Sequence, residues 1–250
     1  MSLLDKATVL CWTGGGLTPD TDGEPAGARL VVDSWLVVDG AVRAADAHWA
    51  RFSASCRECG VETASFRRAV MDALPVAGRW FPRVELTATG RLRLLVRPAP
   101  PPVTGPLVVA VAPPGDPRSC PRRKGPDLDL LFALRAHSGA DELLLCDTDG
   151  RLREGALSSL LWWEDAILCT TPAAHTLPGV TRALIIGLAN RRGVELRMRS
   201  PSPAQLAGRE VWLTSALHGI LAVGEWLSPA QPAGRAQRAP EWQAALEAMR

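Results

Sequence analysis

The side chain with the clearest capacity for covalent chemistry is Lys124, in the stretch RRKGPD at 122–127. Lysine occurs only at positions 6 and 124, although lysine and arginine together number 28, so arginine supplies almost every other cation. Arginine keeps its proton, whereas a lysine amine can lose one, attack a carbonyl and hold an aldehyde as a Schiff base. A lysine after two arginines is also typical of a solvated basic patch, and a coding bias toward arginine gives the same scarcity. The neighbouring segments must decide between these interpretations.

Four segments of the second half of the chain carry further polar groups at the ends of expected elements. Lys124 precedes a helix, and Glu154 directly follows a strand and a turn. The residues 177–181 lead into a second helix, and 214–216 end a later strand. Each segment alone is typical of an ordinary hairpin, a Pro-Gly turn or a helix cap.

Taken together and in this order, the segments resemble the fold-type IV pyridoxal-phosphate enzymes (aminotransferase class IV), and most closely the aminodeoxychorismate lyase-like members. The matching motifs are GADE at 139–142, DTDG at 147–150, EG at 154–155 and LPGVTR at 177–182. The resemblance implies an α+β, two-domain fold like that of D-amino-acid aminotransferase, with a small N-terminal α/β domain and a larger C-terminal α/β pseudo-barrel domain. It also implies pyridoxal 5'-phosphate as the cofactor and a homodimer with each site at a domain interface.

The resemblance also assigns roles to particular residues. Lys124 matches the Schiff-base lysine, which is also the base that moves the substrate proton. Glu154 matches the glutamate that faces the pyridine nitrogen and keeps it protonated. The start of the helix after 179 offers backbone N–H groups and a positive dipole end to the phosphate. The full set expected to bind the cofactor is Arg51, Glu154, Leu177, Val180, Thr181 and Ser215.

The sequence departs from the family pattern mainly in the part expected to bind the substrate. The family's Tyr-Gly-Asp-Gly stretch is replaced by AGARLVVDSWLV at 26–37. Ser34 falls near the position where the lyases carry a threonine, and Ser159 stands where the family has asparagine. Arg97 matches the arginine of the family's Thr-Arg-Gly segment and either grips a substrate carboxylate or lies at a strand end on the surface.

The expected reaction is lyase-like, releasing pyruvate from 4-amino-4-deoxychorismate to give 4-aminobenzoate. The alternative is a class IV aminotransferase acting on an amino acid or a specialised metabolite, which uses the same lysine for a 1,3-proton shift. A third interpretation is a binding protein on the same fold, and the joint presence of Lys124 and Glu154 argues against it.

The elements that must position these residues fall on either side of a proline-rich segment. Five prolines between Pro98 and Pro106 exclude a helix interior or a central strand. We therefore expect an N-terminal domain at 1–99, a linker at 100–107 and a cofactor-binding domain at 108–250. The first is predicted to contain a helix capped by Asp46, a second helix capped by Thr63 or Ser65, and a hairpin around Gly90.

Composition limits the class of partner. A net charge of +2 with 28 basic and 26 acidic residues argues against a nucleic-acid partner, and no segment has the length and apolarity of a membrane span. The start MSLLDKATVL has no signal-peptide pattern, so we expect a cytoplasmic protein. We expect no metal site, because the single Cys-x-x-C pair, Cys56 and Cys59, lacks the further ligands of a zinc site.

Overall fold

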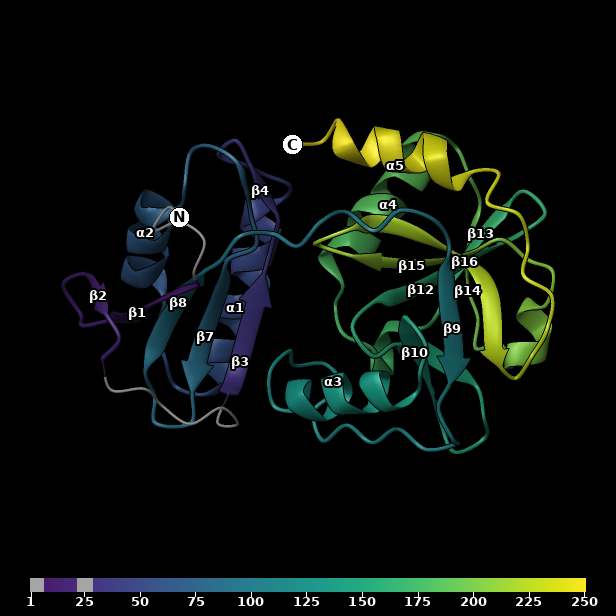
Figure 1. Cartoon of the computed structure of the whole chain (residues 1–250), viewed down its shortest axis with the longest axis horizontal. Helices are drawn as coiled ribbons and strands as arrows, with labels where there is room; N and C mark the ends of the chain where they lie inside the picture. Colours follow the sequence, from purple (N-terminus) through teal and green to yellow (C-terminus); the bar gives the residue numbers. More distant parts are fainter. Residues whose placement is uncertain (1–6, 22–28) are drawn as a thin grey trace. The chain divides into compact units, whose positions relative to one another are not determined.

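The computed structural model describes residues 7–21 and 29–250. Lys6 and the first part of the altered substrate stretch, at 26–28, lie outside the described residues. The chain divides into two compact units (Figure 1). The first contains the described residues up to Pro101 together with Arg123–Pro126 and Met249–Arg250. The second contains Pro102–Arg122 and Asp127–Ala248.

The first unit is built on a five-stranded antiparallel sheet with the order β2-β1-β8-β7-β3. Its strands are β1 (Thr8–Trp12), β2 (Leu17–Pro19), β3 (Arg29–Ser34), β7 (Arg83–Thr87) and β8 (Leu92–Val96). A small second sheet joins β4 (Val37–Val38), β5 (Ala41–Val42) and β6 (Arg79–Trp80). The helices α1 (Ala45–Glu58) and α2 (Ala64–Ala73) pack their apolar faces onto the five-stranded sheet.

Residue alternation along the strands explains this packing. In β7, Val84 and Leu86 are buried in the apolar core beneath the helices. The alternate residue, Glu85, points to the opposite face and pairs with Arg83 and Arg93. One face of the sheet is therefore apolar and the other carries a ladder of charged side chains.

The start of α1 differs from the sequence prediction. The helix begins at Ala45 because Ala44 takes a left-handed conformation (φ 52°), and its carbonyl accepts the N–H groups of Ala47 and His48. Asp46, the predicted N-cap, lies instead in the first turn and pairs with Arg67. The second helix has Thr63 at its N-cap position, one of the two residues predicted there, but the Thr63 side chain makes no capping hydrogen bond.

The second unit is built on one curled, mixed sheet of eight strands with the order β11-β10-β9-β16-β15-β12-β13-β14. Its strands are β9 (Leu107–Val111), β10 (Glu142–Cys146), β11 (Leu152–Gly155), β12 (Ser159–Glu164), β13 (Ile167–Thr170), β14 (Leu196–Met198), β15 (Val211–Ser215) and β16 (Gly219–Ser228). Its helices are α3 (Leu128–His137), α4 (Val180–Arg191) and α5 (Ala239–Glu247). The long strand β16 was not among the predicted elements, and it pairs in parallel with β9.

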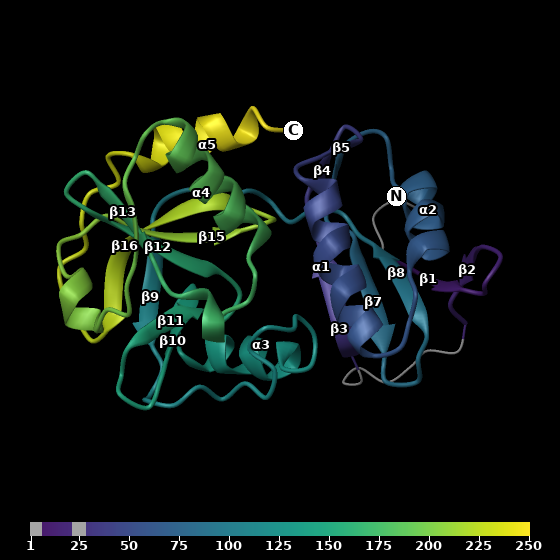
Figure 2. The same ribbon diagram turned by 180° about the vertical axis from the view of Figure 1, so that it is seen from behind.

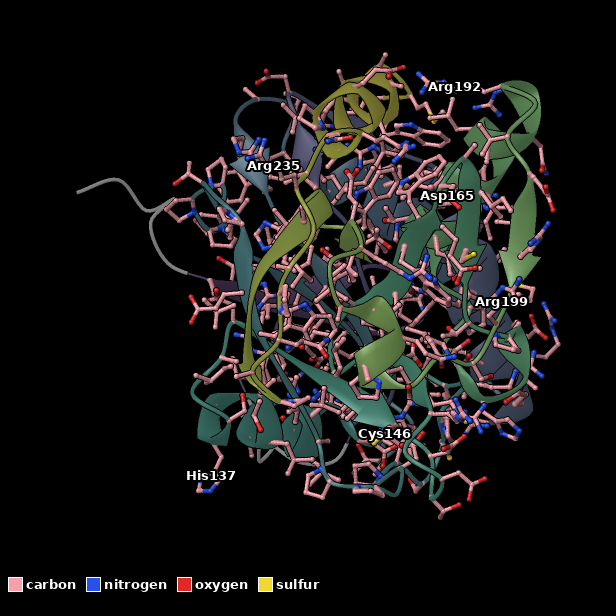
Figure 3. All side chains as sticks on the ribbon, turned by 90° about the vertical axis from the view of Figure 1, so that its right-hand side faces the viewer. His137, Cys146, Asp165, Arg192, Arg199 and Arg235 are labelled. Atoms are coloured by element: carbon pink, nitrogen blue, oxygen red, sulfur yellow. The ribbon has the colours of Figure 1, made fainter. Side chains whose placement is uncertain are left out.

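The helices α4 and α5 pack together beside β15 and β16 (Figure 2). A tryptophan cluster lies beneath them, with Trp163 at 5.6 Å from Trp212 and 5.4 Å from Trp242 between ring centroids. Arg238 covers the Trp163 ring and donates a hydrogen bond to the carbonyl of Asp165. Asp165 lies in the turn between β12 and β13 (Figure 3). These contacts attach the C-terminal helix to the sheet.

Glu210 connects this helix to the strand β15. Its buried carboxylate accepts hydrogen bonds from the indole of Trp212 at 2.9 Å and from the backbone N–H groups of Arg238 and Ala239 at 2.9 Å each. The carboxylate thus supplies acceptors to the first N–H groups of α5, which have no partner inside the helix.

We predict that Glu210→Ala lowers the free energy of unfolding by about 3 kcal/mol, because it leaves several buried donors without an acceptor. Urea denaturation measures the change. Glu225→Ala is the matched control, since that glutamate is exposed on β16. Equal losses for the two variants would show that Glu210 does not fasten α5.

Candidate active site

Lys124 lies in the first unit, against the edge of β3. The backbone N–H of Val32 donates a hydrogen bond of 2.7 Å to the carbonyl of Lys124. Gly125 follows with φ 147°, and a Cβ atom there would lie 2.8 Å from the carbonyl oxygen of Leu30. The Lys-Gly pair is therefore suited to this place, because only glycine allows such a close approach to the strand.

Asp33 is the charged centre beside this segment, and the sequence analysis did not single it out. It is fully buried, and its carboxylate is joined to His48 Nδ1 at 2.9 Å and to the guanidinium of Arg51. The Arg51 contacts are bidentate, with Nε to Oδ2 and Nη2 to Oδ1 both at 2.8 Å. An acidic residue inside an apolar strand was the available signal, since buried charges are nearly always paired.

The surroundings of Lys124 change its proton affinity. Loss of water around the amine lowers the pKa of Lys124 to about 8, and the nearby guanidiniums of Arg51, Arg83 and Arg97 act in the same direction. The carboxylate of Asp33 opposes them. At pH 7 about a tenth of such an amine is neutral, far more than for an ordinary lysine. The amine is thus able to act as a nucleophile or base near neutral pH.

The structure brings the two expected substrate residues into the same unit as Lys124. Ser34 is buried at the end of β3, and its N–H donates to Asp33 at 2.8 Å. Arg97 donates from Nε to the carbonyl of Phe81 at 2.9 Å, and its guanidinium lies 5.0 Å from the Phe81 ring centroid. Burial and the charge of Arg83 lower the pKa of Arg97.

Glu154 lies in the second unit, and the two oxygens of its carboxylate have different surroundings. One oxygen, Oε1, accepts hydrogen bonds from Arg118 Nη1 and from the N–H of Leu177, the latter at 2.8 Å. Within the described part of the chain, Oε2 has no hydrogen-bond partner. Burial raises the pKa of the Glu154 carboxyl, and the charge of Arg118 counteracts it. Arg118 was not predicted from the sequence, since nothing local distinguishes it among many arginines.

The start of α4 belongs to a helix that packs against β15, whose last residue, Ser215, is also expected to bind the phosphate. Val180 and Thr181 are buried in the first helical turn. A Cβ atom on the preceding Gly179 would lie 2.4 Å from the Ser159 hydroxyl, so the helix start approaches β12 closely. Ser159 is the strand partner of Thr214, which precedes Ser215. The hydroxyl oxygen of Ser215 accepts a hydrogen bond from the N–H of His218 at 3.2 Å.

Arg182 stiffens the segment that leads into this helix. Its guanidinium is buried and donates from Nη1 to the carbonyl of Thr171 at 3.4 Å and to the hydroxyl of Thr176 at 3.2 Å. Its charge also acts on Glu154. Leu177, which is expected to contact the cofactor, is therefore fixed in two ways. Its own N–H donates to Glu154, and the residue before it, Thr176, is bound by Arg182.

The cysteines give no support for a redox-active thiol pair or a zinc site in the described part of the chain. All six cysteines are free thiols, and burial raises the pKa of Cys56 to about 12. In the described ranges, 7–21 and 29–250, no group of three or more His, Cys, Asp or Glu residues could hold a metal ion. No helix of the described residues is long and apolar enough to cross a membrane.

Comparison with known proteins now identifies the family. The family model described as amino-transferase class IV matches residues 30–226, well over half of the chain. The chain belongs to the class IV aminotransferase family. No curated protein matches the sequence. The fold expected for this family, a mixed α/β structure of the fold-type IV kind with a curled eight-stranded sheet, is confirmed.

Solved structures of the same fold share little sequence with this class IV chain. A fold IV transaminase from Curtobacterium pusillum is 20% identical, with a TM-score of 0.80 and 97% of each chain covered. A hypothetical aminotransferase from Mycobacterium tuberculosis, in its PLP-bound form, is 20% identical, with a TM-score of 0.80 and 98% of each chain covered. A candidate 4-amino-4-deoxychorismate lyase from Legionella pneumophila is 16% identical, with a TM-score of 0.75, covering 92% of this chain and 96% of that one.

The class IV family uses pyridoxal 5'-phosphate, and the described residues fit this cofactor. Glu154 is 3% exposed yet keeps Oε2 without a partner among the described residues, which suits a ring N–H donor. Thr181 likewise has no hydrogen bond from its hydroxyl to a described residue, and it lies at a helix N-terminus, where anions bind. The Lys124 amine is the group that can hold the aldehyde.

We predict that Gly125→Ala separates the Lys124 segment from β3, because the new methyl group would collide with the backbone of Leu30 and Val31. Hydrogen exchange of the Val32 amide should accelerate about tenfold or more, since its acceptor is the Lys124 carbonyl. Gly90→Ala is the matched control, with a positive φ of 81° but open space around it. Unchanged protection of Val32 in Gly125→Ala would contradict this account of the segment.

Proposed function

We propose that this chain is a pyridoxal-phosphate enzyme in which Lys124 is the catalytic amine, and that its reaction is the release of pyruvate from 4-amino-4-deoxychorismate to give 4-aminobenzoate. The observation that carries the proposal is the Lys124 amine, with a pKa near 8, beside the Asp33–Arg51 pair in a class IV chain.

The cofactor, when bound, supplies an aldehyde and an electron-accepting ring. Lys124 in its neutral form would take the proton from the amine-bearing carbon of the substrate and deliver it to the leaving group. The C–O bond on the neighbouring carbon would break as the ring becomes aromatic, and the enolpyruvyl group, once protonated, would depart as pyruvate. Glu154 accepts a hydrogen bond at Oε2 and keeps a proton on the ring nitrogen, while Arg118 maintains the negative charge of the carboxylate. The start of α4 and Ser215 would donate to the phosphate, and Leu177 would pack on the ring. Arg51 is proposed as a further phosphate ligand because it matches the family's phosphate-binding arginine.

Two residues of the first unit support the choice of a lyase substrate. Ser34 keeps a hydroxyl at the position that resembles the lyase threonine, and it is buried next to Asp33. Arg97 offers a guanidinium to a substrate carboxylate, and 4-amino-4-deoxychorismate carries carboxylates. The candidate lyase from Legionella pneumophila shares the fold.

Transamination is the second candidate. The guanidiniums of Arg83 and Arg97 both act electrostatically on Lys124, which suits a 2-oxo acid that carries a second carboxylate. The Mycobacterium tuberculosis aminotransferase has a form with α-ketoglutarate and PMP bound, at 21% identity. A transaminase would convert the amino-acid donor and the oxo-acid acceptor in turn with the same lysine.

The proposal includes a homodimer, by the family resemblance, and a cytoplasmic location. Six free thiols, several of them buried, fit a reducing compartment. Small molecules are the proposed substrates, and no nucleic-acid or membrane partner is proposed.

Capture of the cofactor should depend on pH through the charge of Lys124. We predict that the rate at which the apo protein develops the visible band of pyridoxal 5'-phosphate rises with pH and levels off above about pH 8. The direction follows because the neutral amine, which attacks the aldehyde, is the form present above the pKa. Binding of pyridoxine 5'-phosphate, which lacks the aldehyde, should show no such rise. A capture rate that is flat between pH 6 and pH 9 would contradict the assignment.

Pyruvate release tests the reaction itself. We predict that cofactor-loaded protein releases pyruvate from 4-amino-4-deoxychorismate, that Lys124→Ala abolishes the release, and that Lys6→Ala leaves it unchanged. Glu154→Gln should lower the rate about a hundredfold or more, because a neutral amide holds the ring proton poorly. Loaded protein that releases no pyruvate but transfers amino groups to 2-oxo acids would establish the second candidate. Loss of neither activity in Lys124→Ala would contradict both.

A further inference from the structure

Asp33 has no part in the chemistry described so far, although its surroundings are unusual for a carboxylate. It is fully buried and accepts hydrogen bonds from the N–H of Ser34, from two nitrogens of Arg51 and, in the matching tautomer, from His48. These contacts and the positive charge of Arg51 hold the pKa of Asp33 far below its usual range in spite of its burial. A carboxylate kept ionised in the interior is costly, so its pairing has structural consequences.

The pairing fixes the direction of the Arg51 guanidinium. Asp33 uses the edge formed by Nε and Nη2. The guanidinium is planar and rigid, so the opposite edge, between Nη1 and Nη2, must point away from Asp33 in one defined direction. Arg51 comes from α1 and Asp33 from β3, so this contact also sets the position of the helix residue relative to the strand edge that carries Lys124.

Asp33 is also the negative charge that balances a group of cations around Lys124. The charged groups that act on this amine are Arg51 from α1, Arg83 from β7, Arg97 after β8 and Asp33 from β3. His48, on α1, is neutral near pH 7, because burial lowers its pKa in spite of the Asp33 contact. Loss of Asp33 would remove the carboxylate that acts on this amine, while the three guanidiniums would remain.

We propose that Asp33 is a positioning residue: its carboxylate orients the Arg51 guanidinium toward the cofactor phosphate and balances the charge around the Lys124 amine. This inference rests on the proposed function for its first half, since Arg51 is assigned there to the phosphate. Its second half concerns the apo protein and stands without any cofactor. The two halves separate experimentally, because an Asp33→Glu substitution keeps the charge but displaces the partner, whereas Asp33→Asn keeps the shape but removes the charge.

The first experiment measures the proton affinity of Lys124 in the apo protein. The rate of amine acylation by acetic anhydride is followed against pH by peptide mass spectrometry. Lysine occurs only at positions 6 and 124, so Lys6 is an internal reference in each sample. In wild type the midpoint for Lys124 is expected near pH 8. In Asp33→Asn it should fall by about one unit or more, because an opposing charge is removed. Asp33→Glu should keep the wild-type midpoint.

His48→Asn is the matched control for this first experiment. It removes another neighbour of Asp33 but no charge, so the Lys124 midpoint should stay at the wild-type value. A general loosening of the site would shift the midpoint in His48→Asn as well, and that result would overturn the charge-balancing role. An unchanged midpoint in Asp33→Asn would overturn it too.

The second experiment measures the orientation of Arg51. The ratio of the dissociation constants of pyridoxal and pyridoxal 5'-phosphate isolates the contribution of the phosphate. Both Asp33→Asn and Asp33→Glu should reduce this ratio about tenfold or more. The reason is that a misdirected Arg51 guanidinium would make a weaker charge-assisted contact with the phosphate. Arg51→Leu sets the lower limit. A wild-type ratio in Asp33→Glu would overturn the orienting role, even where Asp33→Asn does not fold.

Failure of the proposed function gives a different pattern. If wild type forms no lysine-dependent band with either aldehyde, the assignment of the cofactor to this site is wrong, while the acylation profiles still decide the charge-balancing role. If wild type binds both aldehydes equally, Arg51 does not bind the phosphate and the orienting role is overturned with it.

Discussion

A single backbone contact, from the N–H of Val32 to the carbonyl of Lys124, places the reactive amine of this protein. β3 is the edge strand of its sheet, so it has unpaired backbone groups to offer to another segment. Gly125 permits the approach, because any side chain there would collide with the strand. The strand that receives Lys124 also carries Asp33, so the same contact that fixes the lysine backbone brings its amine into the field of the buried carboxylate and the arginines around it.

The second unit relies on a different constraint, the unequal use of the two oxygens of Glu154. Arg118 and the N–H of Leu177 both engage Oε1, and Arg118 is itself fixed by Asp116 through Nε at 2.9 Å and Nη2 at 2.7 Å. The carboxylate is therefore held in one orientation by groups that do not move easily. An acceptor that is oriented in advance binds its donor without a cost for reorganisation. The rigid part of the candidate site is thus the part that is proposed to face the ring nitrogen.

Much of the fold could be predicted from the sequence because its signals are local. Proline and glycine mark the ends of α2 and α4, and the hairpin around Gly90 has clear alternation on both strands. β16 was missed because Gly224 and Glu225 interrupt its apolar pattern, and its parallel partner β9 lies far earlier in the chain. The cap at Asp46 was misplaced because Ala44 adopts a left-handed conformation that its residue type does not announce.

The candidate site divides in the same way. Motif spacing predicted Lys124, Glu154 and the start of α4, because these groups lie in continuous stretches of sequence. Asp33 and Arg118 were missed because their roles come from partners that are distant in the chain, at α1 for Asp33 and at β11 for Arg118.

The path of the chain also limits how this protein can be taken apart. It leaves the first unit at Pro101, builds β9, returns to the first unit for Arg123–Pro126 and then completes the second unit. The first unit therefore contains a short piece of chain that is encoded within the second. A fragment that ends at the proline-rich segment would lack Lys124. It would also lack the segment Arg123–Pro126, which binds the edge strand β3 through Val32. An exchange of all residues after the proline-rich segment would therefore replace Lys124 together with the second unit.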